Sequence, residues 1–279
     1  MTINYRGLPL MILLLSSLVL LSACGEKKSA TAEEVPPPAP SRLQPDYASA
    51  VHTAHGGGHW EQKQALQADI DLTFAGRNLI NGTLTMLTDV SKVRIDQHDS
   101  IGTSMIWTGD EAAVSPAPSG QRSARFHLLT WPYFIAAPFK ISDPGTFLEE
   151  QGTDSINGKQ TEVGRLTFAS GVGDSPDDWY VLYKDDKDVL QSMAYIVTYG
   201  PTSQEKAEED PHAIVYESYT EVDGVLLSDK WTFWEWRQDS GLTRQIGEAT
   251  LSNLHFTTPA PDFFEVPEDH RIDHVPGGK

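Results

Sequence analysis

Apolar and polar side chains alternate with a period of two along most of the chain beyond residue 60. The clearest run is Leu66–Phe74, where apolar residues at every second position are separated by Gln, Asp and Thr. Successive side chains of a strand point to opposite faces, so such a run predicts a strand with one buried face. The same pattern predicts further strands at residues 79–87, 93–95, 104–107, 161–168, 179–183, 189–199, 212–222, 225–236 and 248–257.

Two segments have helical spacing instead. In Tyr47–His55 the apolar residues recur every three or four positions, and Gly56–Gly58 follows as a stop signal. In Gln121–Phe139 aromatic and aliphatic residues recur at the same spacing, with Pro132 and Pro138 inside the run. Because proline interrupts a helix, we expect two short helices in this segment.

These patterns predict a mainly β protein with one helical interruption. Roughly ten or eleven antiparallel strands, separated by turn signals such as Asn157-Gly158 and Asp223-Gly224, favour a single, strongly curved open β-barrel. An N-terminal helix and a short helical lid insert would complete it. We assign residues 46–279 to this one domain, because an all-β chain of this length can form a single core.

The first residues have the layout of a secretory signal. Arg6 precedes an apolar run that ends at Leu21-Ser22-Ala23-Cys24, and Cys24 is the only cysteine. This ending resembles the lipobox of bacterial lipoproteins. The resemblance implies that residues 1–23 are removed as a signal peptide and that Cys24 is the lipid attachment site, carrying acyl chains such as palmitate. The protein would then be anchored to the membrane and would not span it.

Residues 24–45 are expected to form a flexible tether, because they contain a Pro-Pro-Pro run and almost no large apolar side chain. Gly25 bears on the location by resemblance: in enterobacterial lipoproteins an Asp at this position favours retention in the inner membrane, and Gly does not. We therefore expect a lipid anchor in the outer membrane, with the protein facing the periplasm.

Composition and motif content exclude several classes of partner and of active site. The formal net charge of −18 makes nucleic acid a poor partner and disfavours attraction to anionic lipid headgroups. A single cysteine excludes a disulfide framework, a CxxC redox centre and a thiolate zinc site. The sequence has no Gly-rich phosphate loop and no Gly-x-Ser-x-Gly elbow. We expect a monomer without a cofactor that is not an enzyme.

His52, His55 and His59 are the densest candidates for metal chemistry. Neutral imidazoles are common zinc ligands, and residues three apart share a helix face. The alternative is structural: His55 would interact with the last carbonyls of its helix while Gly56 adopts a left-handed conformation. The acidic loops Asp174–Asp178 and Asp185–Asp188 could suggest calcium, but they lack the ligand spacing of an EF-hand. We predict no metal site.

The segment Trp231–Trp236 has aromatic side chains on both faces of one strand. Trp231 and Phe233 point to one face, and Trp234 and Trp236 point to the other. Both faces must then be buried, under helices or around a cavity, although a plain aromatic core explains the same pattern. The candidate hydrophobic ligand contacts are Phe126, Trp131, Phe134, Phe139, Tyr195, Trp231, Phe233, Trp234 and Trp236.

Several features together resemble the bacterial outer-membrane lipoprotein carrier superfamily, the Lol-type localisation factors. They are the N-terminal helix ending in His55-Gly56-Gly57, Trp60 shortly after it, the strand meander and the mid-chain helical insert. The chain is closer still to an uncharacterised group of such lipoproteins, which share segments like Pro138–Gly145 and Asp177–Tyr180. The resemblance implies an open barrel whose apolar concave face serves as a sleeve for acyl chains.

The expected function is therefore the binding of a hydrophobic ligand, such as an acyl chain or a lipoprotein, in an apolar barrel cavity of a membrane-anchored protein. Two alternatives stay open. One is a metal-dependent envelope hydrolase that uses His52, His55 and His59, and the other is a non-binding envelope scaffold whose barrel is filled with side chains. Metal content distinguishes the hydrolase from the other two, and cavity volume distinguishes the scaffold from the carrier.

The substitution Cys24→Ser is expected to abolish incorporation of labelled fatty acid, because it removes the thiol that forms the thioether. Metabolic labelling followed by cell fractionation measures both acylation and anchoring. Ser22→Ala, which changes a neighbouring small residue, is the control. Equal labelling of the wild type and Cys24→Ser would rule out Cys24 as the attachment point.

Overall fold

The computed structural model describes residues 46–277, and the expected signal peptide, Cys24 and tether lie outside the described residues. The strands of this part form one antiparallel sheet. They are β1 (Ala65–Phe74), β2 (Arg77–Leu87), β3 (Val93–Gln97), β4 (Ser104–Trp107), β5 (Ala112–Ser115), β6 (Thr146–Ile156), β7 (Lys159–Phe168), β8 (Tyr180–Lys184), β9 (Leu190–Tyr195), β10 (His212–Val222), β11 (Val225–Arg237), β12 (Gly241–Thr257) and β13 (Arg271–Ile272).

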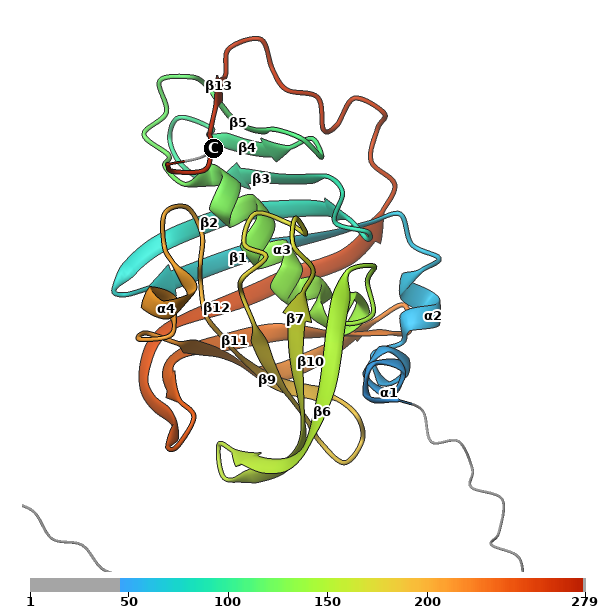
Figure 1. Ribbon diagram of the computed structural model, residues 1–279. Helices are drawn as coiled ribbons and strands as arrows, with labels where there is room; N and C mark the ends of the chain where they lie inside the picture. The colour runs from blue at the N-terminus through green and yellow to red at the C-terminus, as the bar shows by residue number, and fades with distance from the viewer. Residues whose placement is uncertain (1–45, 278–279) are drawn as a thin grey trace, which may run out of the picture. The chain divides into compact units, whose positions relative to one another are not determined.

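The sheet is curved and open. Its strand order is β13-β5-β4-β3-β2-β1-β12-β11-β10-β9-β8-β7-β6, so β13 and β6 are the two free edges. The pairing of β1 with β12 joins the first and last long strands at the centre of the sheet. Figure 1 shows the sheet wrapping around a central helix. The predicted fold class, a mainly β, open antiparallel barrel with an N-terminal helix and a helical insert, is confirmed.

The described residues contain few helices. In Figure 1, α3 lies inside the curve of the sheet, while α1 and α2 follow one another at the start of the domain. Within residues 46–277, no helix combines the length and the apolar character needed to cross a bilayer. The helices are α1 (Tyr47–Ala54), α2 (Gly57–Trp60), α3 (Ala124–Lys140) and α4 (Gln204–Ala207).

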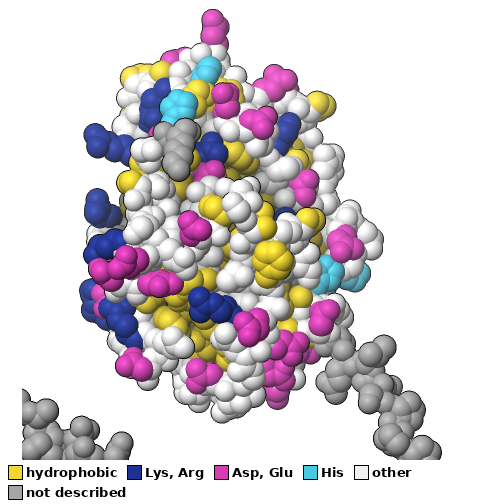
Figure 2. Space-filling view, in the orientation of Figure 1, with side chains coloured by type: hydrophobic (Ala, Val, Ile, Leu, Met, Phe, Trp, Pro, Cys, Tyr) yellow, Lys and Arg dark blue, Asp and Glu magenta, His cyan; other side chains and the backbone are white. Residues whose placement is uncertain are grey.

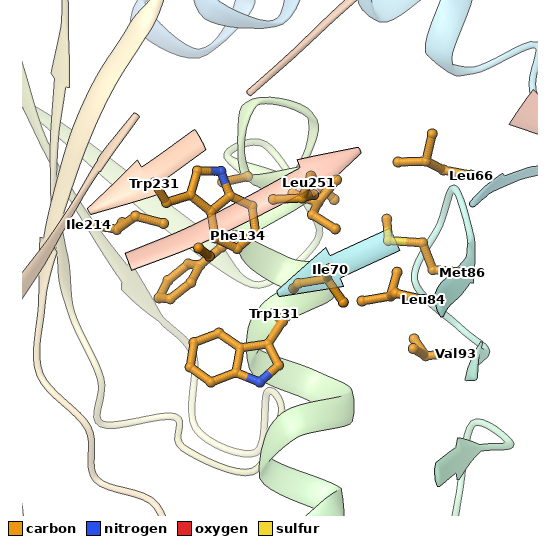
Figure 3. Packing of buried hydrophobic residues seen from close by; sticks show 14 of the residues in the cluster. Leu66, Ile70, Leu84, Met86, Val93, Trp131, Phe134, Ile214, Trp231 and Leu251 are labelled. Atoms are coloured by element: carbon orange, nitrogen blue, oxygen red, sulfur yellow. The ribbon is translucent and has the colours of Figure 1, made fainter. Parts of the chain in front are cut away.

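The alternation in β1 places one row of side chains in the core. Leu66, Ala68, Ile70 and Leu72 are each at most 2% exposed. They belong to the same hydrophobic cluster as Trp131 of α3. Figure 3 shows this helix facing the strand residues across the interior. Burying each large apolar side chain contributes about 1.5–3 kcal/mol, so the match between the sheet and α3 is a main source of stability.

The insert is one continuous helix, and the expectation of two short helices is wrong. Pro138 has no N–H, so the carbonyl of Phe134 loses its partner within the helix. The hydroxyl of Tyr216 in β10 donates to that carbonyl at an O···O distance of 2.9 Å, and both residues are buried. A hydrogen bond from the sheet thus replaces one that proline removes, and α3 continues to Lys140.

The aromatic strand β11 is covered on both faces. Trp231 and Phe233 are 0% exposed, and the ring centroids of Phe233 and Trp131 lie 5.9 Å apart. On the other face, Trp236 belongs to a second, smaller cluster that includes Trp179 and the α4 residue Ala207. The helix α3 therefore packs on one face of β11, and the segment containing α4 packs on the other.

The hydrophobic pattern does not predict β5, β6, α4 or β13. Most side chains of β6 are exposed because it is an edge strand, so it shows no row of apolar residues. The strand β5 is short and built largely from small residues. The two residues of β13 pair with Val114 and Ala113, a contact distant in sequence that local periodicity cannot reveal.

The junction between α1 and α2 is tight. Asp46 caps α1, since its Oδ1 accepts from the Ser49 N–H at 2.8 Å. Gly56 follows the helix with φ +77°, the left-handed conformation expected of it. The run Gly56–Gly58 is expected to end the helical segment, but only Gly56 lies outside a helix, because α2 begins at Gly57. A Cβ on Gly56 would lie 2.1 Å from the carbonyl oxygen of Gly224.

The buried His55 fastens this junction to the sheet. Its Nδ1 donates to the carbonyl of Leu226 at 3.0 Å, and its Nε2 accepts from the N–H of Leu190 at 3.1 Å. The expectation that His55 interacts with the last carbonyls of its own helix is wrong, because both ring nitrogens bind backbone groups of β11 and β9. A short helix is thereby held by contacts distant in sequence.

The substitution Gly56→Ala is expected to lower the free energy of unfolding by about 2–4 kcal/mol, because Ala resists the left-handed conformation and its Cβ overlaps the Gly224 carbonyl. Gly58→Ala is the matched control. No atom lies within 4 Å of a Cβ at Gly58, so this change should be neutral or stabilising by up to about 1 kcal/mol. Denaturant titrations measure both, and equal effects would contradict the prediction.

Two buried histidines are kept neutral in the folded protein. Burial lowers the pKa of His55 and of His127 from 6.5 to about 4. The Nδ1 of His127 accepts from Trp131 Nε1 at 3.0 Å, just as His55 Nε2 accepts from a backbone N–H. Protonation would remove each of these acceptors.

The free energy of unfolding should therefore fall as the pH is lowered from 6.5 towards about 4, because only the unfolded chain binds protons at these histidines in that range. Each histidine contributes about 3 kcal/mol to this dependence. Denaturant titrations across pH can compare the wild type with His127→Gln, whose amide oxygen still accepts from Trp131 but does not titrate. Exposed His255→Gln is the control, and an unchanged pH dependence in His127→Gln would refute the assignment.

Candidate ligand-binding cavity

One face of α3 lines a cavity of about 330 Å³. Apart from Lys140 in its last turn, the lining residues of the helix follow a spacing of three, four, seven and eight positions from the first, which places them on a single helix face. They are Phe126, Leu129, Thr130, Tyr133 and Phe134. Leu128, Trp131 and Ile135 lie instead in the packed core. The helix thus separates a filled part of the interior from an open one.

The opposite wall comes from the sheet, where β7, β8 and β9 each contribute an aromatic residue: Phe168, Tyr180 and Tyr195. The ring centroids of Tyr133 and Tyr180 lie 5.5 Å apart, and those of Phe134 and Tyr195 lie 5.2 Å apart. The volume is at the small end of the range of about 300–1,000 Å³ that is usual for small-molecule sites.

An ion pair borders the cavity near the start of α3. Asp174, in the loop between β7 and β8, accepts from Arg125 Nη2 at 2.8 Å, and both side chains are less than one-fifth exposed. The same guanidinium lies 4.7 Å from the ring centroid of Trp107. The β7–β8 loop, which contributes Val172 to Ser175 to the wall, is therefore tied to the helix.

A second ion pair lies near the end of α3. Lys140 pairs with Asp143, and its Nζ donates to the carbonyl of Asp89 at 3.2 Å. All three residues line the cavity, together with Pro144 and Thr146. On the face shown in Figure 2, apolar side chains reach the surface between acidic ones, and many Lys and Arg side chains gather along one edge. The ion pairs Arg125–Asp174 and Lys140–Asp143 thus place charged groups at the margins of the apolar wall.

Asp178 brings a carboxyl group into the apolar wall. Its Oδ1 accepts from the Thr198 N–H at 2.6 Å and from Thr198 Oγ1 at 2.8 Å. Burial raises the pKa of this carboxyl from 3.8 to about 6, although the Thr198 hydrogen bonds act in the opposite direction. Desolvation therefore outweighs hydrogen bonding at this group.

The tyrosines of the wall stay protonated. Burial raises the pKa of Tyr133, Tyr180 and Tyr195 above the ordinary value of 10.0, and the negative charge of Asp178 adds to the shift. Their hydroxyl groups therefore remain hydrogen-bond donors at neutral pH. The cavity combines aromatic surface with a few polar groups, which is the usual composition of a small-molecule site.

The predicted contact residues occupy different places. Phe126, Phe134 and Tyr195 line the cavity. Phe139 stacks on Trp60 of α2, with ring centroids 4.4 Å apart, and so joins the last turn of α3 to the N-terminal helices. Ligand binding by the three lining residues stays a prediction.

The four β11 residues among the candidate ligand contacts do not line this cavity. Trp231 and Phe233 are buried in the main core, where Phe233 contacts Trp131 of α3. Trp236 lies in the second cluster, and Trp234 Nε1 donates to Thr232 Oγ1 at 2.9 Å. The reason is that α3 packs directly on β11 and fills the space between them.

Sequence reasoning missed Leu129, Tyr133, Tyr180 and Asp178. The first two share the helical spacing of Phe126 and could be found by treating 121–139 as one helix. No local signal distinguishes Asp178 from its exposed neighbour Asp177, because its place in the wall depends on β8 and on Thr198.

The histidine cluster does not provide three metal ligands. Both ring nitrogens of His55 are used by backbone groups, which leaves no lone pair for an ion. His52 Nε2 lies 3.2 Å from a carboxylate oxygen of Glu61. Among residues 46–277, no group of three or more His, Cys, Asp or Glu side chains has an arrangement that could hold a metal ion.

The sequence matches no protein-family model and no curated protein. Its structure is similar to that of a LolA superfamily protein from Nitrosomonas europaea, with a TM-score of 0.51, 10% identity, and coverage of 78% of this chain and 97% of the other. A DUF1329 family protein from Desulfovibrio piger has a TM-score of 0.49 and 12% identity, over 78% of this chain and 95% of the other. A putative outer membrane lipoprotein-sorting protein domain from Vibrio parahaemolyticus has the same TM-score of 0.49 and 12% identity, over 78% and 94%.

The likeness to the Nitrosomonas europaea protein is one of fold, since few residues are identical. The described part of this chain therefore has the open β-barrel fold of a LolA superfamily protein.

Proposed function

We propose that the domain binds a hydrophobic ligand of the acyl-chain class in the cavity beside α3. The observation that carries the proposal is the cavity itself, which has a volume of about 330 Å³ and a wall made mainly of aromatic and aliphatic side chains. A scaffold barrel filled with side chains would leave no such space. The volume suits one chain or part of a larger lipid.

The fold supports the same proposal. The sequence resembles Lol-type localisation factors, and that resemblance implies an apolar concave face that takes acyl chains. Here α3 covers the concave face and leaves the cavity between its half-buried side and β7–β9. Binding is the activity we assign to the domain, and no catalytic role is part of the proposal.

We further propose that the whole chain is a monomeric lipoprotein of the outer membrane that faces the periplasm. Cys24 would carry the acyl chains, residues 24–45 would form the tether, and residues 46–279 would form the binding domain. Support comes from the Leu-Ser-Ala-Cys ending, from Gly25 and from the Pro-rich composition of the tether. A tethered domain can take up a hydrophobic ligand while it stays near the bilayer.

An uncharged, environment-sensitive dye such as Nile red tests the proposal. The chain from position 24, carrying Cys24→Ser to prevent acylation, should bind the dye and shift its emission to shorter wavelength. Leu129→Trp should weaken binding on the order of tenfold, or about 1.4 kcal/mol, because the larger indole would occupy part of the space that the dye needs.

Leu242→Trp is the matched control, since Leu242 is also a half-buried leucine but packs against the second cluster. It should bind the dye like the wild type. Circular dichroism must show that each variant is folded. Absence of dye binding by the folded wild-type sequence, or equal weakening by both tryptophans, would refute a binding site in this cavity.

A further inference from the structure

Asp178 is the one carboxylate of the cavity wall that is held by neither a basic side chain nor its own turn. Both of its side-chain hydrogen bonds go to Oδ1, from the Thr198 N–H and from Thr198 Oγ1. Within residues 46–277, Oδ2 accepts no hydrogen bond. A carboxylate has room for about four hydrogen bonds. Asp178 can therefore accept a donor from a molecule bound in the cavity.

The other charged residues of the wall do not offer a site for an anion. Lys140 is its only lysine or arginine, and it is paired with Asp143 and with the carbonyl of Asp89. Arg125, at the other end of α3, is held by Asp174. An anionic group in the cavity would have to break one of these ion pairs or accept only from neutral donors, such as the hydroxyl groups of the wall tyrosines. Its charge would then stay uncompensated by a cation, which is costly in a poorly solvated site.

Among the acidic groups of the wall, and within residues 46–277, only the Asp178 carboxylate lacks both a basic partner and a hydrogen bond within its own turn. Asp143 and Asp174 are neutralised by their basic partners, and the carboxylate of Asp89 accepts from Ser91 in its own turn. Asp178 is left with a lone pair and no cation. Burial raises its pKa to about 6, and a ligand donor would supply part of the solvation that this carboxylate lacks.

We infer that the cavity selects amphiphiles whose polar end donates a hydrogen bond and carries no negative charge, namely amines and alcohols, and that Asp178 accepts this hydrogen bond. The apolar part of the ligand lies against α3 and the aromatic residues of β7–β9. Fatty-acid anions are disfavoured, because their carboxylate would face Asp178 without a free cation. The inference rests on the proposed function, since it requires the cavity to bind an apolar chain.

Three probes with the same alkyl chain test the selectivity: dodecylammonium, dodecanol and dodecanoate. Calorimetric titrations at neutral pH, below the micelle concentration, use the chain from position 24 with Cys24→Ser. Dodecylammonium and dodecanol should bind on the order of tenfold more tightly than dodecanoate, because only they can donate to Asp178.

The variant Asp178→Asn should weaken dodecylammonium binding on the order of tenfold and leave dodecanoate binding unchanged or improved, because it removes the charge but keeps an acceptor for Thr198. Asp177→Asn is the matched control. It removes the same charge from the exposed neighbouring position, outside the cavity wall, and should keep the wild-type order of affinities.

The outcomes separate this inference from the proposed function. Equal affinities for the three probes, or tighter binding of dodecanoate, would overturn the selectivity and leave hydrophobic binding intact. Failure of all three probes and of Nile red to bind would overturn both. If Asp178→Asn does not fold, the order of affinities in the wild type and in Asp177→Asn decides the question.

Discussion

A single curved sheet cannot bury its own concave face, and the rest of this structure depends on how that face is covered. One helix, α3, covers most of this face and places Leu128, Trp131 and Ile135 in the core formed by the sheet. The helix persists through Pro138 because Tyr216 of β10 donates to the carbonyl of Phe134. The sheet therefore stabilises the helix that covers it.

The helix divides the interior into two parts. Towards β11 the packing is tight, with Trp131 and Phe134 against Phe233. Towards β7–β9 the same helix leaves a cavity of about 330 Å³. Ion pairs at both ends of α3 hold the loops that border this space. The proposed binding site thus comes from the shape of the fold: one helix covers the concave face without filling it.

The polar groups of the interior fall into two classes. His55 and His127 are buried with defined hydrogen bonds and serve the fold, and their low pKa makes the folded state sensitive to acid. Asp178 is different, because one of its oxygens is held by Thr198 while the side chain also borders the cavity. A partly satisfied carboxylate in an apolar wall costs stability, and a ligand that donates to it would offset that cost.

The sequence by itself determined the fold class and most long strands, because the alternation in segments such as Leu66–Phe74 reflects a buried face directly. It also carried the features on which the predicted anchor at Cys24 rests. Only the tertiary structure decided that α3 is continuous, because that depends on the hydrogen bond from Tyr216. Only the tertiary structure decided which aromatic residues line a cavity, because packed cores and apolar sites require the same side chains and differ in the space between elements distant in sequence.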